Sequence, residues 1–598
     1  MQNNEVSPSG LRQIPRNWIS REEAALNEGL TFPDFSGGEI PLLVKRLLRA
    51  RKVITSDDLE QILNPRLAQL RDPYLILGME KAAERLTDSF QKNERVCIYA
   101  DFDLDGTSGL ALLFEGLRIL GFKNLQYYQP LRLSEGYGFH PHVVEDLSQQ
   151  GVKLIVTVDV GITALEAVQK AKELGVDVIV TDHHQPAKQL PQALAIVNPN
   201  QSGDQSGLGY LCGAGVAFYL LRAVQRKLVN DGILKESNLN LKSLLDFLAI
   251  ATLTDLVPLV GDNRSLVKAG LLQLEKTQRP GLRKLLSALQ LEGRPLTGQD
   301  VAIRFAPKLN ALSRLENGLL PVDLFLVSDE EKAEQMVKSV LSSNEDRVSL
   351  QHQGERLATE ILSEWPHKDF VFVSSTQFHR GVIGLIATKM AQAFNCPAFV
   401  GSENDEGLIV GSSRLPNGEE GSVLLALQAA TTVLNRFGGH HSASGFELHK
   451  ANQQAFIDLL NRHFQTLDER ALTIEQEFDF ELSQEDVTEK SMKNLDAIGP
   501  FGQGFAVPQF VFRNLKVKSV YELRGGHLKI SFHRESAVDK SEARTGNFEA
   551  LYFSPPSQLR KPVAGVLLDV LGELQWNYFA GKQSVQLLVR DLKEAGLS

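Results

Sequence analysis

Three short, nearly continuous runs of apolar and β-branched residues constrain the fold of this chain more than any other feature. They are RVCIYA at 95–100, VKLIVTV at 152–158 and VDVIVT at 176–181. Such runs are typical of strands that are buried on both faces, as in a parallel sheet. Helical patterns, SGLALLFEGLRIL and TALEAVQKAKELG, follow the first two runs. This alternation of strand and helix predicts an open α/β sheet.

Acidic residues and histidines come at or just after the end of each run. They are Asp101, Asp103 and Asp105 after the first run, Asp159 after the second, and Asp182, His183 and His184 after the third. Because the carboxyl ends of parallel strands meet at one edge of an open sheet, we expect these side chains to converge. The first cluster alone could be a solvated Asp-Gly turn. Carboxylates and imidazoles without thiolates instead favour a site for Mn²⁺ or Mg²⁺.

The rest of the chain divides into segments with different patterns. Residues 329–364 contain no proline and are densely charged, which predicts a long connecting helix, whereas the last ~130 residues alternate with period two, which predicts an antiparallel barrel. We therefore expect a multidomain α/β chain. Its predicted parts are a loose leader at 1–45, a catalytic parallel-sheet domain at 46–328, the connecting helix at 329–365, a smaller α/β domain at 366–465 and an all-β barrel at 466–598.

Composition excludes several classes of protein. The 598 residues are 43% hydrophobic and 23% charged, an ordinary globular mixture, and no stretch reaches the ~18 apolar residues of a membrane span. The three cysteines are far apart, and the N-terminus has no apolar core behind a basic start, so we expect a cytoplasmic protein. The net charge of −10 alone argues against a nucleic-acid partner, but residues 501–598 carry 13 basic and 9 acidic side chains.

Four motifs resemble the metal-binding motifs of the DHH phosphoesterase superfamily. They are YADFDLDG, VTVDVGIT, VTDHHQP and TLTDLVPL, and FGGHHSASGF is similar to the signature of the DHH-associated domain. The pieces KLNALSRLEN, HRGVIGLIA and GPFGQGF resemble those of the bacterial single-stranded-DNA-specific exonucleases within this superfamily. The resemblance covers nearly the whole chain from about residue 45, and it implies an oligonucleotide-binding fold for the terminal barrel.

The resemblance implies a site for two Mn²⁺ or Mg²⁺ ions. By similarity, Asp103 and Asp159 hold one ion with help from Asp101. The second ion is implied to be held by Asp105, Asp159, His183 and Asp255, with Asp159 bridging, while His184 contacts the scissile phosphate. Val160 stands where the family commonly has Asn, but no implied ligand is missing.

The resemblance also implies contacts to the substrate. Arg132, Ser412 and Arg414 match positions of a pocket for the 5′-phosphate, in which guanidinium groups bind phosphate by paired hydrogen bonds. Arg304 and Arg314 flank KLNALSRL and are implied to line the strand path. His379 and His440 head glycine-containing turns that allow close approach to a phosphate or base.

The function implied is a 5′→3′ exonuclease that degrades single-stranded DNA to 5′-mononucleotides in repair and recombination. A single-strand-binding protein and a helicase are the implied protein partners, and no membrane is involved. Two alternatives stay open. One is a DHH phosphodiesterase on short oligonucleotides or cyclic dinucleotides, and the other is a single-strand-binding scaffold whose catalysis has decayed.

Overall fold

In a computed structural model of the chain, the described residues fall into two compact units. They are residues 16–33, 38–235, 240–255, 257–316, 318–367, 369–416, 421–466, 474–533, 548–553, 555, 561–579 and 582–596. The first unit, here called the α/β unit, holds Leu70–Pro258 and Leu266–Ile474. The second, the barrel unit, holds Arg16–Gln69, Leu259–Ser265 and Glu475–Ser598. Each unit is described by itself.

A five-stranded parallel sheet forms the first half of the α/β unit, as the sequence predicted. In spatial order its strands are β3 (Leu125–Tyr128), β2 (Val96–Ala100), β4 (Leu154–Val158), β5 (Asp177–Thr181) and β6 (Ala195–Val197). Every residue of the two central strands β2 and β4 is buried. This double-sided burial explains why the two runs have no polar alternation.

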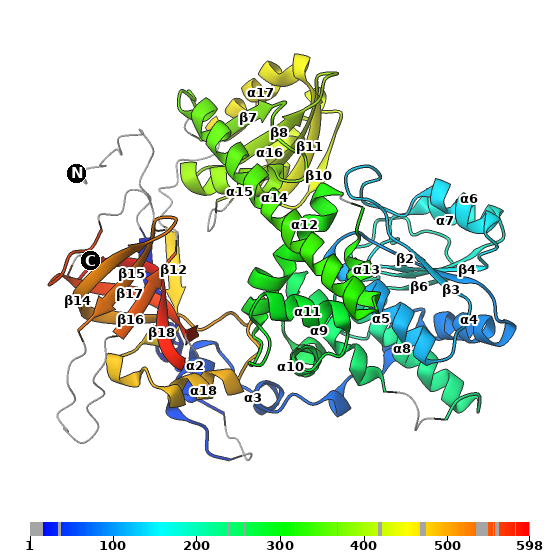
Figure 1. Ribbon diagram of the computed structural model, residues 1–598, viewed down its shortest axis with the longest axis horizontal. Helices are drawn as coiled ribbons and strands as arrows, with labels where there is room; N and C mark the ends of the chain where they lie inside the picture. The colour runs from blue at the N-terminus through cyan, green and yellow to red at the C-terminus, as the bar shows by residue number, and fades with distance from the viewer. Residues whose placement is uncertain are drawn as a thin grey trace. The chain divides into compact units, whose positions relative to one another are not determined.

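Helices cover both faces of this sheet (Figure 1). One face packs on α6 (Pro141–Gln149) and α7 (Leu165–Glu173), whose apolar side chains join those of β2, β4 and β5 in one buried cluster. On the other face lie α4 (Met79–Lys92), α5 (Leu104–Ile119) and α8 (Gly213–Asn230). The α5 and α8 helices begin at the carboxyl edge of the sheet, so their N-termini point toward the acidic residues that follow the strands.

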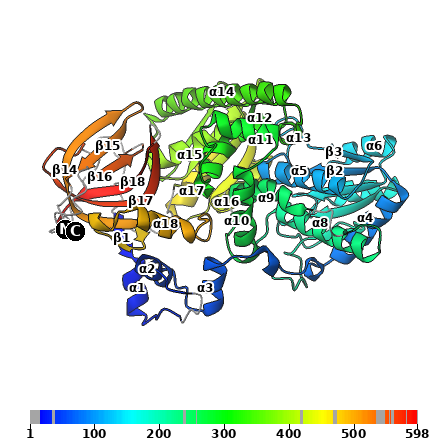
Figure 2. The same ribbon diagram turned by 60° about the horizontal axis from the view of Figure 1, so that its bottom comes forward.

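Further helices lead from this sheet to the second half of the α/β unit. They are α9 (Leu245–Thr254), α10 (Gly261–Glu275), α11 (Pro280–Ala288), a π-helical stretch (Asp300–Phe305), α12 (Ala306–Leu315), α13 (Pro321–Leu326) and α14 (Glu330–Leu362). The α14 helix is the predicted connecting helix and runs unbroken for 33 residues (Figure 2). Eight of its residues are buried, because α11 and α12 pack on one part of it and α15 (Ile383–Phe394) on another.

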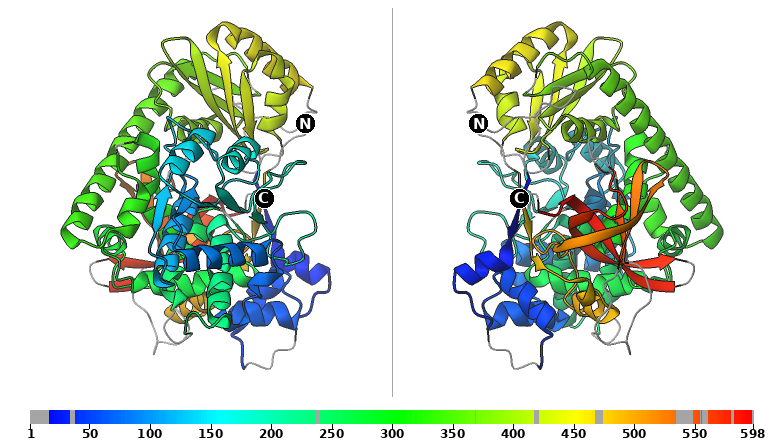
Figure 3. Two further views of the ribbon diagram at one scale, coloured as in Figure 1. Left: turned by 90° about the vertical axis from the view of Figure 1, so that its right-hand side faces the viewer. Right: turned by 90° about the vertical axis from the view of Figure 1, so that its left-hand side faces the viewer.

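A second, mixed five-stranded sheet follows. In spatial order it contains β10 (Arg436–Gly439), β11 (Ala443–His449), β9 (Leu408–Arg414), β8 (Ala398–Glu403) and β7 (Val371–Ser375). Only β7 and β8 are parallel to each other. The helices α14 and α15 cover one face of this sheet, and α16 (Val423–Ala429) and α17 (Gln453–Gln465) cover the other (Figure 3).

The barrel unit is built on a closed six-stranded sheet. Its strands are β13 (Phe480–Glu481), β14 (Phe510–Leu523), β15 (His527–Phe532), β16 (Phe548–Tyr552), β18 (Lys582–Glu594) and β17 (Leu567–Phe579), and β14 also pairs with β17 to close it. The orange and red strands in Figure 3 show the curvature of this sheet. The expectation of a wholly antiparallel barrel was wrong, because β13 runs parallel to β14 and β16 runs parallel to β18.

The N-terminal segment differs from the predicted loose leader at 1–45. Its first 15 residues lie outside the described part, but β1 (Arg16–Ser20) and α1 (Arg21–Asn27) are regular elements of the barrel unit. The helices α2 (Leu42–Ala50) and α3 (Ser56–Leu63) belong to the same unit, although we expected residues from 46 onward to be part of the catalytic parallel-sheet domain. There β1 pairs with β12 (Ile474–Phe478), and α18 (Glu489–Ala497) contacts α2. The pairing partners lie more than 400 residues away in sequence, so local pattern could not reveal them. No described helix is long and apolar enough to cross a membrane.

Candidate metal centre and anion pocket

The ends of three strands and one helix bring acidic side chains and an imidazole together. Asp101 follows β2, Asp159 follows β4 and His183 follows β5, while Asp255 is the residue at the C-terminal end of α9. The Nε2 atom of His183 lies 3.2 Å from Asp159 Oδ1, 3.5 Å from Asp255 Oδ2 and 3.7 Å from Asp105 Oδ2. The convergence that the sequence predicted is therefore present in the geometry.

Asp159 lies at the centre of this cluster in a backbone conformation that is rare for its residue type. Its φ is +61°, in the left-handed region, which side chains other than glycine adopt mainly where the surroundings enforce it. A Cβ on Gly213, the first residue of α8, would lie only 2.5 Å from the Asp159 Cβ. Glycine at 213 is thus required for the helix to begin this close to Asp159.

The other two acids of the first motif are held by helix N-termini. Asp103 caps α5, and its Oδ1 accepts hydrogen bonds from the backbone N–H groups of Asp105 and Gly106, at 2.9 and 3.0 Å. The Asp105 carboxylate accepts hydrogen bonds from the N–H groups of Gly213, at 2.6 Å, and Ala214, at 2.9 Å. Unpaired N–H groups and the helix dipole favour anions at such positions, so both side chains are fixed before any ligand binds.

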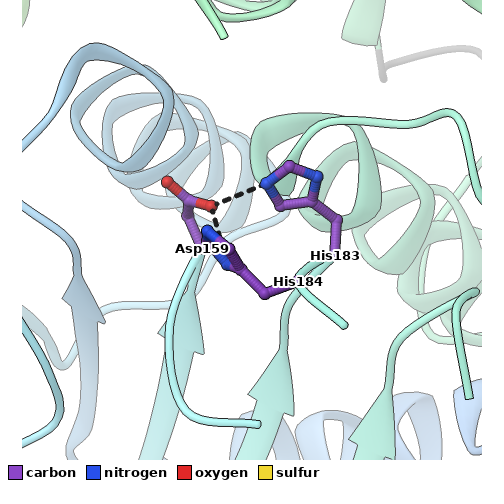
Figure 4. A group of neighbouring side chains, drawn as sticks. All are labelled: Asp159, His183 and His184. Carbon is purple, nitrogen blue, oxygen red and sulfur yellow. Dashed lines mark ion pairs between the residues drawn. The ribbon is translucent and has the colours of Figure 1, made fainter. Parts of the chain in front are cut away.

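His184 is oriented by Asp182, and its ring lies beside that of His183 against Asp159 (Figure 4). The Asp182 Oδ1 atom lies 2.8 Å from His184 Nδ1 and also accepts from the N–H groups of His183 and His184, while its Oδ2 accepts from the Ile162 N–H. The side chain of His184 is 43% exposed, and its Nδ1 lies 3.7 Å from Asp159 Oδ1. The bond to Asp182 leaves Nε2 as the ring atom available to a substrate.

The donor atoms of this cluster match what a divalent cation needs. Three groups could each hold an ion, namely Asp101 with Asp103 and Asp159, Asp105 with His183 and Asp255, and Asp159 with His183 and His184. Four buried atoms have no hydrogen-bond partner among the described residues: Asp101 Oδ1, Asp159 Oδ1, His183 Nε2 and Asp255 Oδ2. A buried polar atom without a partner is costly, so four at one point indicate that a ligand completes the site.

The shifted pKa values of the cluster also indicate a site for a cation. Burial, followed by the charge of Asp103, raises the pKa of Asp101 to about 8, and burial, followed by Asp105, raises the pKa of Asp255 to about 9. Burial also raises the pKa of Asp159 and lowers the pKa of His183. Crowded carboxylates that resist ionisation on their own become favourable ligands once a cation is present.

A group of basic side chains lies in the same unit. Burial lowers the pKa of Arg414 and of Arg314, to about 10 for Arg314, and the charge of Arg132 lowers both further. Arg414 donates to Ser412 Oγ at 2.7 Å, Arg314 donates to the Gly381 carbonyl at 3.0 Å, and the Arg132 guanidinium lies over the Phe102 ring at 5.0 Å. None of the three guanidinium groups pairs with a carboxylate of the described residues. Mutually repelling, half-buried cations of this kind are suited to a polyanion.

The other residues that were predicted to contact the substrate are Arg304, His379 and His440. Arg304 is exposed and pairs with Asp300 at 3.3 Å, so its charge is already partly compensated. His379 is half-buried, and its Nδ1 accepts from the N–H of Gly381, next to Arg314. His440 is exposed at the turn between β10 and β11.

The sequence did not reveal the residues that position the side chains of the proposed metal site. Asp182 was recognised only as a further strand-end acid, although it orients His184. The N–H groups of Gly213 and Ala214 were not recognised at all, although GAGVAFYL opens a helix and carries the glycines that such an anion-holding N-terminus needs. Val160, which replaces the common Asn, is 1% exposed and packs in the core between the sheet, α6 and α7.

Two family models match the chain. The DHH family N-terminal domain matches residues 95–252, and the RecJ OB domain matches residues 478–591. Among characterised proteins, the chain is 32% identical to the single-stranded-DNA-specific exonuclease RecJ of Dickeya dadantii over 572 residues, which is 92% of this chain and 96% of the relative. It is also 32% identical to RecJ of Escherichia coli over 575 residues, 93% of this chain and 96% of the relative.

Solved structures agree with this similarity. RecJ of Thermus thermophilus in complex with Mn²⁺ superimposes with a TM-score of 0.75 at 26% identity, covering 97% of this chain and 79% of the relative. A second structure, exonuclease RecJ bound to manganese, is 31% identical and gives a TM-score of 0.56, covering 66% of this chain and 96% of the relative.

Proposed function

Since this chain belongs to the RecJ family of single-stranded-DNA-specific exonucleases, we propose that it removes 5′-mononucleotides from single-stranded DNA in the 5′→3′ direction. We also propose that it uses two Mn²⁺ or Mg²⁺ ions to do so. The observation that carries the proposal is the set of four buried atoms on Asp101, Asp159, His183 and Asp255 that have no hydrogen-bond partner among the described residues. Manganese in the related structures supports the choice of metal.

In the proposed site, two sets of ligands share Asp159. Asp101 and Asp103 join Asp159 on one side, and Asp105, His183 and Asp255 join it on the other. When bound, such a pair of ions lowers the pKa of a water and neutralises the charge that develops on the leaving oxygen of an in-line displacement. Asp182 holds the His184 ring by Nδ1, so that Nε2 can donate a hydrogen bond to the scissile phosphate.

The proposed polarity depends on the anion pocket. Arg132, Arg414 and Ser412, with Arg314 beside them, offer guanidinium and hydroxyl donors, and none of the three arginines forms an ion pair with a carboxylate of the described residues. Guanidinium groups bind a terminal phosphate through paired hydrogen bonds, which favours an end over an internal phosphate. A 5′-phosphate held here would present the first phosphodiester bond to the metal site.

The barrel unit is proposed to bind the strand downstream. Tyr521 is 61% exposed on β14, whereas the indole N–H of Trp576 is bonded to Asp496, which supports a stacking role for Tyr521 in particular. Repair and recombination are the proposed setting. A helicase that supplies single strands and a single-strand-binding protein that coats them are the proposed partners.

Digestion of end-labelled single strands tests the function. We expect release of the 5′ label as a mononucleotide with Mn²⁺ and no release in EDTA, and we expect duplex DNA of the same sequence to resist. Release of the 3′ label first would overturn the polarity. Cleavage restricted to fragments of two to five nucleotides, or to cyclic dinucleotides, would support a short-substrate phosphodiesterase. Tight binding without cleavage would support a scaffold.

A further inference from the structure

The loop that carries Arg132 is held by two glutamates from opposite sides. Glu135, within the loop, accepts a hydrogen bond from the N–H of Leu131 at 2.7 Å and from the hydroxyl of Tyr128 at 2.6 Å. Glu316, which follows the last residue of α12, accepts from the N–H of Leu133 and, at 3.2 Å, from the N–H of Ser134. The residue that follows Arg132 is therefore bonded to a side chain 183 positions later in the sequence.

Glu316 has an unusual backbone conformation. Its φ is +49°, in the left-handed region, and its N–H closes the last turn of α12 by bonding to the Leu312 carbonyl at 3.0 Å. A helix commonly ends in this conformation, but the residue there is usually glycine, because a side chain costs energy. The glutamate at this position bears that cost, and its carboxylate accepts the N–H groups of Leu133 and Ser134.

The same end of α12 is fixed on its other side. The Arg314 side chain donates to the Gly381 carbonyl, and a Cβ on Gly381 would lie 2.0 Å from the Arg314 carbonyl oxygen. The loop from His379 to Val382 thus packs directly on α12, and Gly384, in the first turn of α15, lies close to Arg414, whose Nη2 would be 3.0 Å from a Cβ at 384. The end of α12 connects the Arg132 loop to the part of the unit that carries Arg414.

We propose that Glu316 is a positioning residue, which fixes the Arg132 loop to α12 so that Arg132, Arg314 and Arg414 form a single pocket for a terminal phosphate. The inference rests on the proposed 5′-phosphate pocket and adds the residue that assembles it. The three guanidinium groups repel one another. Without Glu316 only the Glu135 contacts hold the loop against this repulsion, so Arg132 can move away from the other two. Because the three guanidinium groups are held together before the substrate binds, less free energy is lost in ordering them during binding.

The ratio of kcat/KM on 5′-phosphorylated and 5′-hydroxyl single strands measures this role in the full-length protein. In Glu316→Ala we expect the ratio to fall about tenfold, the size expected from losing hydrogen bonds to a charged group. We expect the change to lie in KM, with kcat at saturating Mn²⁺ and Mn²⁺ binding measured by electron paramagnetic resonance both unchanged. Glu334→Ala removes the same charge from an exposed ion pair on α14 and should leave the ratio unchanged.

Two conservative variants separate hydrogen bonding from charge. Glu316→Gln keeps an acceptor at the same reach and should retain most of the preference for a 5′-phosphate. Glu316→Asp keeps the charge but is one methylene shorter, and it should behave like alanine. If Asp retains the preference and Gln loses it, or if Glu316→Ala weakens both substrates equally, the positioning role is wrong. This contrast remains decisive even if the alanine variant is unstable.

The phosphate pocket itself is tested by Arg132→Ala. If this variant loses the preference and the double variant with Glu316→Ala loses no more, the two residues act as a unit, as proposed. If Arg132→Ala loses the preference but the Glu316 variants keep it, only the positioning role fails. If Arg132→Ala keeps the preference, the 5′-phosphate pocket fails and the role of Glu316 fails with it.

Discussion

In the proposed site, the carboxylate of Asp159 is the ligand that both ions would share. Its Oδ1 is buried with no hydrogen-bond partner in the part of the chain that the structure describes, and His183 Nε2 lies 3.2 Å away. We expect Asp159→Ala to reduce hydrolysis by at least about 10³-fold, because the site loses several kcal/mol of charge stabilisation. Initial rates on labelled single strands at saturating Mn²⁺ measure this loss. Asp88→Ala, which removes an exposed acid of α4, is the matched control, and near-normal turnover in Asp159→Ala would refute the shared ligand.

The raised pKa values predict how the metal-free protein responds to pH. The pKa is about 8 for Asp101 and about 9 for Asp255, against about 4 in an unfolded chain, so the folded protein keeps protons that the unfolded chain releases. The stability due to these protons is complete below about pH 4 and is lost as the pH rises through the two folded values. We therefore expect the melting temperature in EDTA to decrease from about pH 6 to about pH 8.5.

The variant Asp255→Asn tests this effect, because an amide does not titrate. It also removes a charge that raises the pKa of Asp159, and both changes reduce the proton uptake linked to folding. Its melting temperature in EDTA should decrease less over the same range, and added Mg²⁺ should raise the melting temperature of the unmodified protein most at the alkaline end. Equal pH slopes in the two proteins would show that Asp255 ionises normally in the folded state.

At the scale of elements, the N-terminus of α8 determines the geometry of the site. Gly213 and Ala214 donate to Asp105, and Gly213 leaves the space that Asp159 occupies. We expect Gly213→Ala to displace Asp159 and to lower kcat/KM by about 10²-fold, the cost of misplacing a catalytic group by about 1 Å. In the control Gly215→Ala, the new Cβ faces only the side chain of Leu211, at 3.2 Å, so activity should be retained. Similar losses in both variants would indicate a general effect on α8.

The same elements show what the sequence could and could not reveal. The strands β2, β4 and β5 were predictable because burial on both faces leaves a continuous apolar run, and parallel topology then brings Asp101, Asp159 and His183 to one edge. The hydrogen bond from the N-terminus of α8 to Asp105 joins residues 108 positions apart in the sequence. The hydrogen bond from the Arg132 loop to Glu316 joins residues 183 positions apart. No local pattern encodes such a contact. The sequence therefore indicated the ligands, and only the folded chain shows the residues that hold them.

At the scale of the whole molecule, residues 16–69 complete a unit whose other parts come mostly from residues 475–598. Val44, Leu47 and Leu48 of α2 are buried in one cluster with Met492 and Leu495 of α18 and with side chains of the barrel strands. A charged contact joins the same two segments. Arg51 donates to both carboxylate oxygens of Asp479, at 2.9 and 3.0 Å. This arrangement makes α2 dependent on residues more than 400 positions later in the sequence.

A comparison of two fragments tests this dependence. In a fragment of residues 1–474, the apolar face of α2 has lost the surface that buries it, whereas a fragment of residues 70–474 lacks α2 altogether. We expect the longer fragment to bind the dye ANS and to self-associate, because an uncovered apolar patch is an association site in water. Leu259 and Arg264 lose their hydrogen-bond partners in both fragments, so this loss does not affect the comparison. Size-exclusion chromatography and dye fluorescence measure the result. If the fragment of residues 1–474 stays monomeric and does not bind the dye, α2 does not depend on the barrel for its burial.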